Sequence, residues 1–316
     1  KRLLIEGTIT QIKDKSLTIL DTSIGRGGDL NKYFPYAPID GKEIEFLLGL
    51  DISSNINEAA KRFYEEHMKK GKAMFLQYDT SKSIIKGEGL IRKEDKPYYS
   101  ILFEPEKSVP KKYQNIKKKY NTFVKKDFSI ISSQFSFHYY FETEDTLRSY
   151  IQNISDMCKK DGYFIGTCYD GNRVFEVLKE GNMEMEDELG NIVYSIKKNY
   201  EMESFDYDSS NKGNMFGNKI DVYMSSIGKE FTEYLVNFEM VEDIMKEYNF
   251  EKVELKHKLV GDGIVSFEEV LKVLEKLKEK DKFLRKNKNI LSMNKKINKP
   301  LYDLSCLNNW FIFQKK

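Results

Sequence analysis

The chain has 316 residues, of which 40% are hydrophobic, and its 52 Lys and Arg against 50 Asp and Glu leave a formal net charge of only +2. This length can bury one sizeable core, and the near-neutral balance excludes non-specific nucleic-acid binding through total charge alone. There is no apolar run of membrane-spanning length and no secretory signal at the start, and the three cysteines form no CxxC pair, which suits a reducing compartment.

Strand-like and helix-like segments alternate through the first half of the chain, which predicts a parallel sheet with crossover helices. We predict strands over residues 17–21, 43–51, 73–79, 127–134 and 163–167, and helices over residues 29–34, 53–70 and 144–160. In the less regular second half we predict strands over residues 192–198, 219–224, 252–258 and 309–314, and helices over residues 239–248 and 266–280. We expect residues 1–316 to form a single α/β domain.

A long insertion, residues 81–126, separates the third and fourth predicted strands, where a short connection would suffice. It contains Pro97, Pro105 and Pro110 and then the lysine-rich stretch 111–119. A connection of this length is usually functional or mobile. Its lysines indicate either a solvated surface loop, or binding to RNA phosphates or to a partner.

A glycine-rich turn follows the first predicted strand, with glycines at positions 25, 27 and 28 that let the backbone approach a ligand. The spacing departs from the dinucleotide fingerprint GxGxxG. Asp29 stands at the helix start where a dinucleotide site would receive its pyrophosphate, and Asp21 ends the strand. Two carboxylates would repel a pyrophosphate, whereas they suit a ligand with an amino group and a sulfonium, such as S-adenosylmethionine.

Aspartates also end the next two predicted strands. Asp51 is placed to accept both hydroxyls of a ribose, and Asp79 lies where an adenine edge could sit. The structural alternative makes Asp29 a helix cap and the others ordinary strand-end residues. Because ligands of parallel α/β sheets bind at the carboxyl edge, four aspartates along that edge favour a cofactor site.

Aromatic residues surround a histidine directly after the fourth predicted strand, in the segment Gln134-Phe135-Ser136-Phe137-His138-Tyr139-Tyr140-Phe141-Glu142. Such runs more often belong to a core. This run follows a strand's carboxyl end, at the same edge as the glycine turn. Aromatic faces hold a stacked base with about 1–3 kcal/mol, so the segment predicts a platform for a flat base.

These segments together resemble the mRNA cap guanine-N7 methyltransferases. The turn Asp21-x-x-x-Gly25-Arg26-Gly27-Gly28-Asp29 is similar to the family's Asp-x-x-x-Gly-Lys-Gly-Gly-Asp loop, and the segment 134–142 matches its most specific motif, Gln-Phe-x-x-His-Tyr-x-Phe-Glu. Further segments that resemble the family are residues 1–5, 51–53, 79–82, 162–167, 216–217 and 233–236.

The resemblance implies a Rossmann-like methyltransferase fold, with helices on both faces of a mostly parallel sheet and a C-terminal antiparallel addition. It implies transfer of a methyl group from S-adenosylmethionine to N7 of the cap guanine of a capped RNA, with no metal and no side chain acting as nucleophile or base. The implied cofactor-binding residues are Lys1, Asp21, Ser23, Gly25, Asp29, Asp51, Asp79 and Gln134. The implied cap-binding residues are Phe135, His138, Tyr139 and Glu233 for the guanine, and Arg26 and Arg62 for the phosphates.

Three positions depart from the family's pattern. Ser23 replaces a glycine in the loop, and Tyr169 replaces a common proline after the fifth strand. The family's C-terminal tyrosine, which covers the base, corresponds to Asn308, and Tyr302 and Trp310 are the candidate substitutes.

The long insertion suggests the C-terminal domain of a large-DNA-virus capping enzyme. This origin implies triphosphatase and guanylyltransferase domains of the same polypeptide as partners, no membrane contact, and a place in the host cytoplasm or virion, whereas a cellular homologue would be nuclear. Two rival hypotheses are a methyltransferase for another RNA and a catalytically inactive stimulatory subunit. The EF-hand-like segment 262–269 is rejected, because aligning its glycine puts Lys258 at the first calcium-ligand position.

Overall fold

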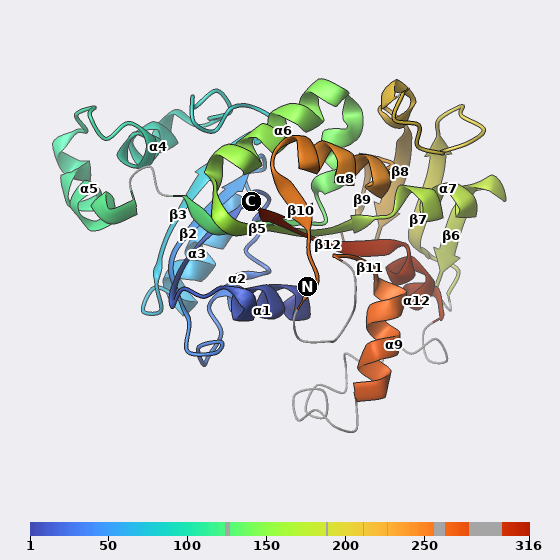
Figure 1. The fold of residues 1–316 in the computed structure, drawn as a ribbon, viewed down its shortest axis with the longest axis horizontal. Coiled ribbons are helices and arrows are strands. Elements are labelled where there is room, and N and C mark those ends of the chain that lie inside the picture. Colours follow the sequence, from blue (N-terminus) through green and yellow to red (C-terminus); the bar gives the residue numbers. More distant parts are fainter. Residues whose placement is uncertain (124–126, 188, 211, 226, 256–262, 278–298) are drawn as a thin grey trace.

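The computed structural model describes residues 1–123, 127–187, 189–210, 212–225, 227–255, 263–277 and 299–316. A central sheet joins its strands in the order β10-β12-β5-β4-β1-β2-β3, and β11 pairs with β12 (Figure 1). The strands are β1 (Ser16–Asp21), β2 (Glu43–Asp51), β3 (Lys72–Gln77), β4 (Phe128–Gln134), β5 (Cys158–Tyr169), β10 (Phe250–Lys252), β11 (Ile264–Ser266) and β12 (Asn308–Lys315). β1 to β5 are parallel to one another, and β12 is antiparallel to β5, β10 and β11. The mostly parallel sheet with an antiparallel C-terminal addition is therefore confirmed.

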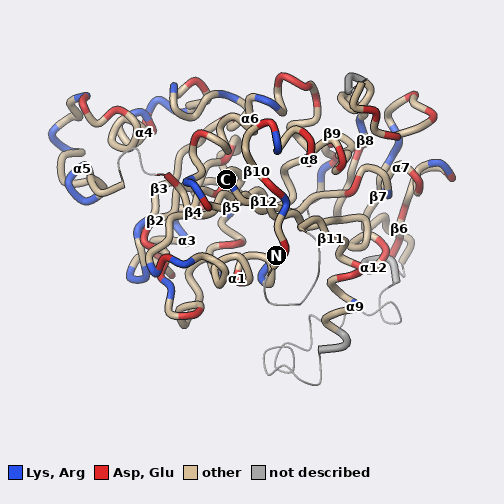
Figure 2. The backbone as a smooth tube through the Cα atoms, viewed as in Figure 1, with Lys and Arg blue, Asp and Glu red and all other residues tan. Residues whose placement is uncertain are grey.

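The insertion between β3 and β4 folds into helices α4 (Lys96–Phe103) and α5 (Gln114–Tyr120). Its buried residues Tyr99, Ile101 and Phe123 belong to the same core as the sheet, and the Tyr120 hydroxyl donates to the carbonyl of Ala73 on edge strand β3. Residues 81–126 carry thirteen Lys and Arg against five Asp and Glu, and blue stretches mark α5 in Figure 2. The insertion is thus a packed, basic lobe rather than a solvated loop.

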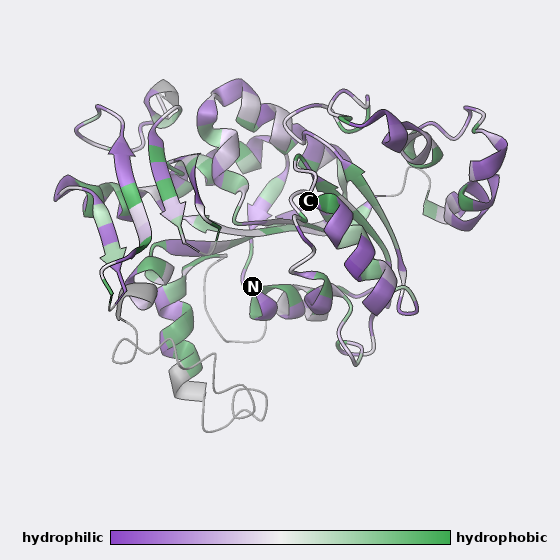
Figure 3. Ribbon diagram, turned by 180° about the vertical axis from the view of Figure 1, so that it is seen from behind, coloured by the Kyte–Doolittle hydropathy of each residue, from purple (hydrophilic) through white to green (hydrophobic). Residues whose placement is uncertain are grey.

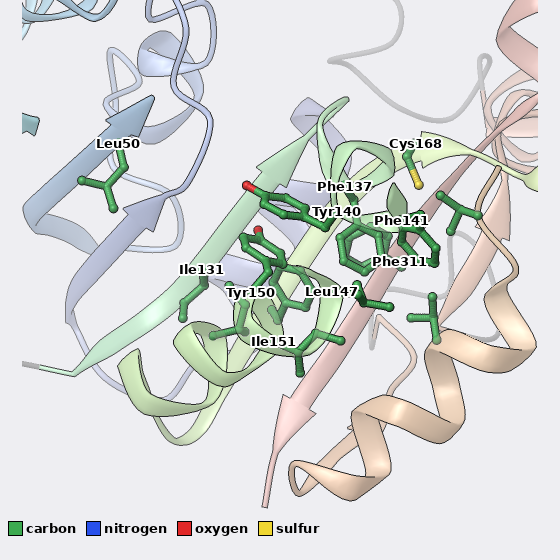
Figure 4. Packing of buried hydrophobic residues seen from close by; sticks show 14 of the residues in the cluster. Leu50, Ile131, Phe137, Tyr140, Phe141, Leu147, Tyr150, Ile151, Cys168 and Phe311 are labelled. Atoms are coloured by element: carbon green, nitrogen blue, oxygen red, sulfur yellow. The ribbon is translucent and has the colours of Figure 1, made fainter. Parts of the chain in front are cut away.

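Helices cover both faces of the central sheet (Figure 3). One face packs against α1 (Arg2–Gln11), α2 (Leu30–Tyr33), α3 (Ile56–Glu66) and α9 (Phe267–Leu277), and the other against α6 (Glu144–Met157) and α8 (Phe238–Glu247). Alternate side chains of a strand serve opposite faces, so that Ile19 and Ile130 lie in one core, whereas Leu20 and Ile131 lie in the other. Figure 4 shows this second core between the sheet and α6.

A second, antiparallel sheet has the order β6-β7-β8-β9. Its strands are β6 (Met183–Glu186), β7 (Ile192–Asn199), β8 (Lys219–Met224) and β9 (Lys229–Tyr234). It follows α7 (Gly171–Lys179), and β9 packs against the short 3₁₀ helix η4 (Phe137–Glu142) at the end of β4. The second sheet therefore meets the central sheet at the edge where the parallel strands end.

Several predicted boundaries were wrong. The third helix starts at Ile56 with Asn55 at its N-cap, not at residue 53, and β3 ends at Gln77, so Asp79 lies two residues beyond it. β5 starts at Cys158, because the chain continues through Asp161 in a left-handed conformation instead of breaking there. The strand predicted over residues 252–258 is β10, which ends at Lys252; residues 256–258, like the end of the helix predicted over 266–280, lie outside the described residues.

The sequence analysis also missed α1, α7, β6, β9 and α12 (Lys299–Cys306). Across the described residues, no helix combines the length and the apolar character that crossing a membrane requires.

Candidate active site

The glycine turn after β1 is held by the carboxylate of Asp51, which accepts the amide of Gly25 at 2.7 Å and that of Ser53 at 2.9 Å. Gly25 and Gly27 adopt φ of +53° and +76°, which favours glycine. A Cβ on Gly27 would also lie 2.7 Å from Leu30 and 3.1 Å from the backbone of Ala59. Two of the three glycines therefore have a structural requirement, one for the turn and one for the approach of α3.

Asp21 lies beneath this turn and is only 1% exposed. Its carboxylate accepts the amide of Ser23 at 3.0 Å and the hydroxyl of Tyr33 at 2.8 Å. Burial, with the nearby charge of Asp29, raises the pKa of Asp21 to about 7. Asp21 therefore supports the floor of the turn, and it does not line the large cavity described below.

Asp29 is compensated by two lysines, because Lys1 and Lys32 donate to its two carboxylate oxygens at 3.1 and 2.6 Å. Its pKa stays lowered despite burial, because of these ammonium groups. It makes no side-chain hydrogen bond as a helix cap. The two carboxylates of the turn thus differ, since that of Asp29 is paired with lysines and that of Asp21 is buried; their role in cofactor binding stays a prediction.

A cavity of about 700 Å³ opens beside the turn at the carboxyl ends of the parallel strands. Four of the eight predicted cofactor residues line it, namely Ser23, Asp51, Asp79 and Gln134. Thr22, Ser53, Ser81 and Ser136 add further polar side chains. The lining therefore offers hydroxyls, carboxylates and an amide to one elongated polar ligand.

Gln134 and the serines around it fix the cavity's wall. Gln134 accepts from the Thr167 hydroxyl at 3.2 Å and donates to the Ser132 hydroxyl at 3.1 Å. The hydroxyl of Ser136 donates to that of Ser23 at 2.7 Å. Ser23, which replaces the family's glycine, thereby ties the turn to the segment after β4.

The aromatic segment after β4 forms η4, which is anchored in the core. Phe137 and Phe141 are fully buried, and the ring of Tyr140 stacks on that of Tyr150 at 3.5 Å (Figure 4). The Tyr140 hydroxyl is 2.5 Å from that of Thr80, beside the cofactor cavity. Core packing of Phe137, Tyr140 and Phe141 therefore presents His138 and Tyr139, which lie between them, to a second cavity.

That second cavity, of about 380 Å³, adjoins the first. Phe135, Tyr139 and Phe231 line both cavities, and their side chains are about two-fifths exposed. Phe135 has φ of +58°, a strained conformation for a bulky residue, and Lys1 lies 4.8 Å from the centre of its ring. The remaining lining is His138, Tyr169, Val222, Met224, Ile227, Glu233, Phe267, Leu304, Ser305 and Asn308.

His138 and Glu233 face each other inside the second cavity, with Nε2 3.4 Å from Oε1. Burial lowers the pKa of His138 to about 3 and raises that of Glu233 to about 8. The contact is therefore between two neutral groups and not an ion pair. Neither ring nitrogen of His138 nor Oε2 of Glu233 has a hydrogen-bond partner. Buried polar atoms are normally satisfied, so this cavity suits a planar ligand that supplies hydrogen bonds.

Neither candidate for the base-covering residue lines the second cavity. Trp310 is 2% exposed in the core, and Tyr302 is absent from the cavity's described lining. One of the rings that line it next to position 308 is that of Tyr169, which lies 6.3 Å from the ring of His138 and nearly parallel to it. Tyr169 is the cross-strand partner of Asn308 between β5 and β12. The two departures from the family's pattern thus lie side by side.

The predicted phosphate residues lie outside both cavities. Arg26 is two-thirds exposed on the glycine turn, with Nε 3.6 Å from Glu58 of α3, and Arg62 is partly exposed on α3. The structure therefore leaves their phosphate role a prediction. Among the described residues, no group of three or more His, Cys, Asp and Glu could hold a metal ion.

Sequence reasoning missed Thr22, Tyr33, Phe231 and Phe267 as site residues, and it placed Asn308 at the base-covering position without giving the asparagine itself a role. For Phe231 a signal was present: it stands two residues before Glu233, so both side chains point to the same face of β9. Phe267 reaches the cavity only through the packing of α9, which no local pattern indicates.

A polar cavity at the carboxyl ends of parallel strands is where α/β folds bind a nucleotide-like cofactor. Residues 1–307 match the model of the mRNA (guanine-N(7))-methyltransferase domain. The chain therefore belongs to the mRNA cap guanine-N7 methyltransferase family.

Named relatives agree with this assignment. The mRNA cap guanine-N(7) methyltransferase of Schizosaccharomyces pombe is 26% identical over 263 residues, which cover 81% of this chain and 59% of the relative. That of Eremothecium gossypii is 26% identical over 74% of this chain and 46% of the relative. A probable mRNA-capping enzyme of Acanthamoeba polyphaga mimivirus is 30% identical over 72% of this chain and 18% of its own length. The chain thus spans about half the length of the fungal relatives and a smaller part of the viral one.

Proposed function

We propose that this chain transfers the methyl group of S-adenosylmethionine to N7 of the guanine that caps an mRNA. The observation that carries the proposal is the arrangement of the two cavities. Asp51 and Asp79 line only the first, Glu233 lines only the second, and Phe135, Tyr139 and Phe231 line both. Because N1 and the 2-amino group of guanine lie opposite N7, a guanine whose N–H edge faces Glu233 directs N7 to the junction of the cavities.

The first cavity holds the cofactor in this proposal. Asp51 accepts the ribose hydroxyls while its oxygens also fix the glycine turn, and Asp79, with Oδ1 bonded to Ser81, lies at the adenine end. Lys1, beside Asp29 and Phe135, supplies positive charge near the methionine end. The cofactor, when bound, supplies a methyl group already activated on a sulfonium.

The second cavity positions the guanine. Glu233 accepts the N1–H and the amino group once its carboxyl is ionised, and His138 and Tyr139 flank the ring. The N7 lone pair is free, so no side chain has to remove a proton. The residues act by placing N7 in line with the methyl carbon and by excluding water, and the proposal requires no metal.

A methyl-transfer assay tests this function directly. The chain is incubated with tritiated S-adenosylmethionine and GpppA-ended RNA, and with ApppA-ended RNA as the control. We expect label in the cap of GpppA-RNA only, recovered as 7-methylguanosine. Label in internal nucleotides would favour a methyltransferase for another RNA, and cofactor binding without transfer to any RNA would favour an inactive subunit.

The mimivirus relative supports a further part of the proposal, because this chain aligns with only 18% of its length. A domain that methylates the cap would act on the product of guanylyl transfer, so a covalent link to those activities would shorten the transfer of the RNA end. Capped RNA, and the other capping domains of one polypeptide, are the proposed partners.

A further inference from the structure

Asn308 carries a buried hydrogen-bond acceptor with no partner in the second cavity. The residue is 5% exposed and lines the cavity with Glu233. Its amide nitrogen donates to the carbonyl of Leu304 at 3.3 Å, whereas its Oδ1 accepts no hydrogen bond. An unpaired buried acceptor is costly, so a ligand donor is the expected partner of this oxygen.

β5, the strand next to β12, provides the aromatic ring that position 308 lacks. Asn308 is paired with Tyr169 across β12 and β5, and the Tyr169 ring lies along the cavity wall near His138. An aromatic side chain is therefore supplied from β5, and the β12 position is free to carry a polar group. The pair combines an apolar ring with an acceptor at one place in the wall.

The number of acceptors matches the donors of guanine. Guanine offers three N–H bonds on this edge, one from N1 and two from the 2-amino group. A carboxylate takes the N1–H and one amino hydrogen, which leaves the second amino hydrogen unpaired. Resting on the proposed function, we propose that Asn308 is a specificity residue whose Oδ1 accepts the second hydrogen of the guanine 2-amino group.

An inosine cap tests this assignment, because inosine lacks the 2-amino group. The measured quantity is kcat/KM for GpppA-RNA and for IpppA-RNA, in wild type and in Asn308→Leu. We expect the variant to lose about 2- to 13-fold on the guanosine cap, the range of one neutral hydrogen bond, and to be unchanged on the inosine cap. Asn199→Leu, an exposed asparagine of β7, is the matched control and should change neither value.

Two outcomes would overturn the assignment. If Asn308→Leu lowers kcat/KM equally on both caps, Asn308 acts only through its bond to Leu304. If the variant keeps the wild-type kcat/KM on the guanosine cap, the oxygen of Asn308 meets no substrate donor. If wild type methylates neither cap, the proposed function fails. In that case, calorimetry of GTP and ITP binding to wild type and to Asn308→Leu still shows whether Asn308 contacts the 2-amino group.

If Asn308→Leu does not fold, a measurement on the wild-type chain still tests the assignment. An N2-methylguanosine cap keeps the hydrogen that Glu233 needs and replaces the one assigned to Asn308. We expect its kcat/KM to fall by about the factor that Asn308→Leu loses on the guanosine cap, and to stay above that of the inosine cap, which also lacks the amino hydrogen bonded to Glu233. A value equal to that of the guanosine cap would contradict the role of Asn308.

Discussion

Asp51 stands out at the scale of single residues, because its oxygens hold the glycine turn and it also lines the first cavity, where we propose that the cofactor binds. Charge-assisted hydrogen bonds contribute about 1.5–3 kcal/mol each. We therefore expect Asp51→Ala to weaken S-adenosylmethionine binding at least about 10-fold, measured by calorimetry. Asp156→Ala, an exposed aspartate of α6, is the control. Unchanged affinity in Asp51→Ala would remove Asp51 from the site.

A substitution of Glu233 should impair binding of the cap guanine and spare binding of the cofactor. Glu233→Ala should abolish guanine methylation, because the base loses the acceptor of its N1–H, and it should leave S-adenosylmethionine affinity nearly intact, because Glu233 does not line that cavity. Glu230→Ala is the matched control, since Glu230 lies on the same strand, exposed and paired with Lys197. Wild-type methylation by Glu233→Ala would show that Glu233 has no part in reading the base.

The buried carboxyl of Glu233 also links stability to pH. Its pKa is raised from 4.5 to about 8 by burial, so between these values the folded state keeps a proton that the unfolded chain releases. The free energy of unfolding therefore falls as pH rises through this range. Glu233→Gln cannot titrate, and its stability relative to wild type should increase by more than about 1 kcal/mol between pH 5 and pH 8.

Urea unfolding of both proteins at the two pH values measures this change. The quantity compared is the difference in the free energy of unfolding between the two proteins at each pH. Groups that titrate alike in both proteins cancel in this difference. A difference that is the same at both pH values would mean that Glu233 is ionised in the folded chain, and the neutral contact with His138 would then be wrong.

Individual site residues could be predicted where they belong to a continuous motif. Residues 21–29 and 134–142 lie together at the sheet edge because β1 and β4 are adjacent parallel strands. The burial of Asp21 and the neutralisation of Asp29 could not be predicted, since both depend on Tyr33, Lys1 and Lys32. Tyr169 lies in the cavity wall because of its place in the β5–β12 pairing, which no single segment encodes.

At the scale of elements, η4 is anchored because Phe137, Tyr140 and Phe141 enter the core. Phe137 is fully buried and contacts the rings of Phe141, Tyr150 and Phe311. Phe137→Ala should lower the free energy of unfolding by about 3–5 kcal/mol, measured with denaturant. Val177→Ala, at an exposed position of α7, should cost far less. Equal costs would show that η4 does not depend on this anchor.

Elements with a clear hydrophobic period could be predicted, and the others could not. β2 carries a nearly continuous apolar run over residues 46–50, which predicts a buried strand, and β4 is buried throughout. In contrast, the first four residues of β9 are exposed, so this strand carries little apolar signal although it holds Glu233. α1 has no acidic residue in its first turn and no side-chain cap, which removed the usual start signals of a helix.

At the scale of the whole molecule, charge is unevenly distributed. The insertion has an excess of eight positive charges in a chain of net charge +2, and α5 lies at one end of the longest axis, away from β9, which carries Glu233 (Figure 1). The lysines of α5 therefore do not adjoin the second cavity. Lys117 is also engaged with the carbonyls of Pro105 and Lys107. A contact with RNA would require a transcript long enough to cross the molecule.

We expect the combined changes Lys111→Gln, Lys112→Gln, Lys118→Gln and Lys119→Gln to act only on long substrates. KM for a long capped RNA should rise and its dependence on salt should flatten, whereas KM for the cap dinucleotide should stay unchanged. Steady-state assays at two salt concentrations measure both. Equal effects on the two substrates would indicate damage to the fold, and no effect on either would exclude RNA as the ligand of this lobe.

The position of β12 has a consequence for folding during synthesis. Residues 308–315 are inserted between β5 and β10, although every other strand of the sheet precedes them in the chain. During synthesis one edge of β5 therefore stays unpaired until these residues leave the ribosome. The cofactor half of the sheet, β1 to β5, can assemble first, and the base cavity gains Asn308 only in the final step. An exposed edge strand invites association with other chains, so this edge is open to such association until β12 is added.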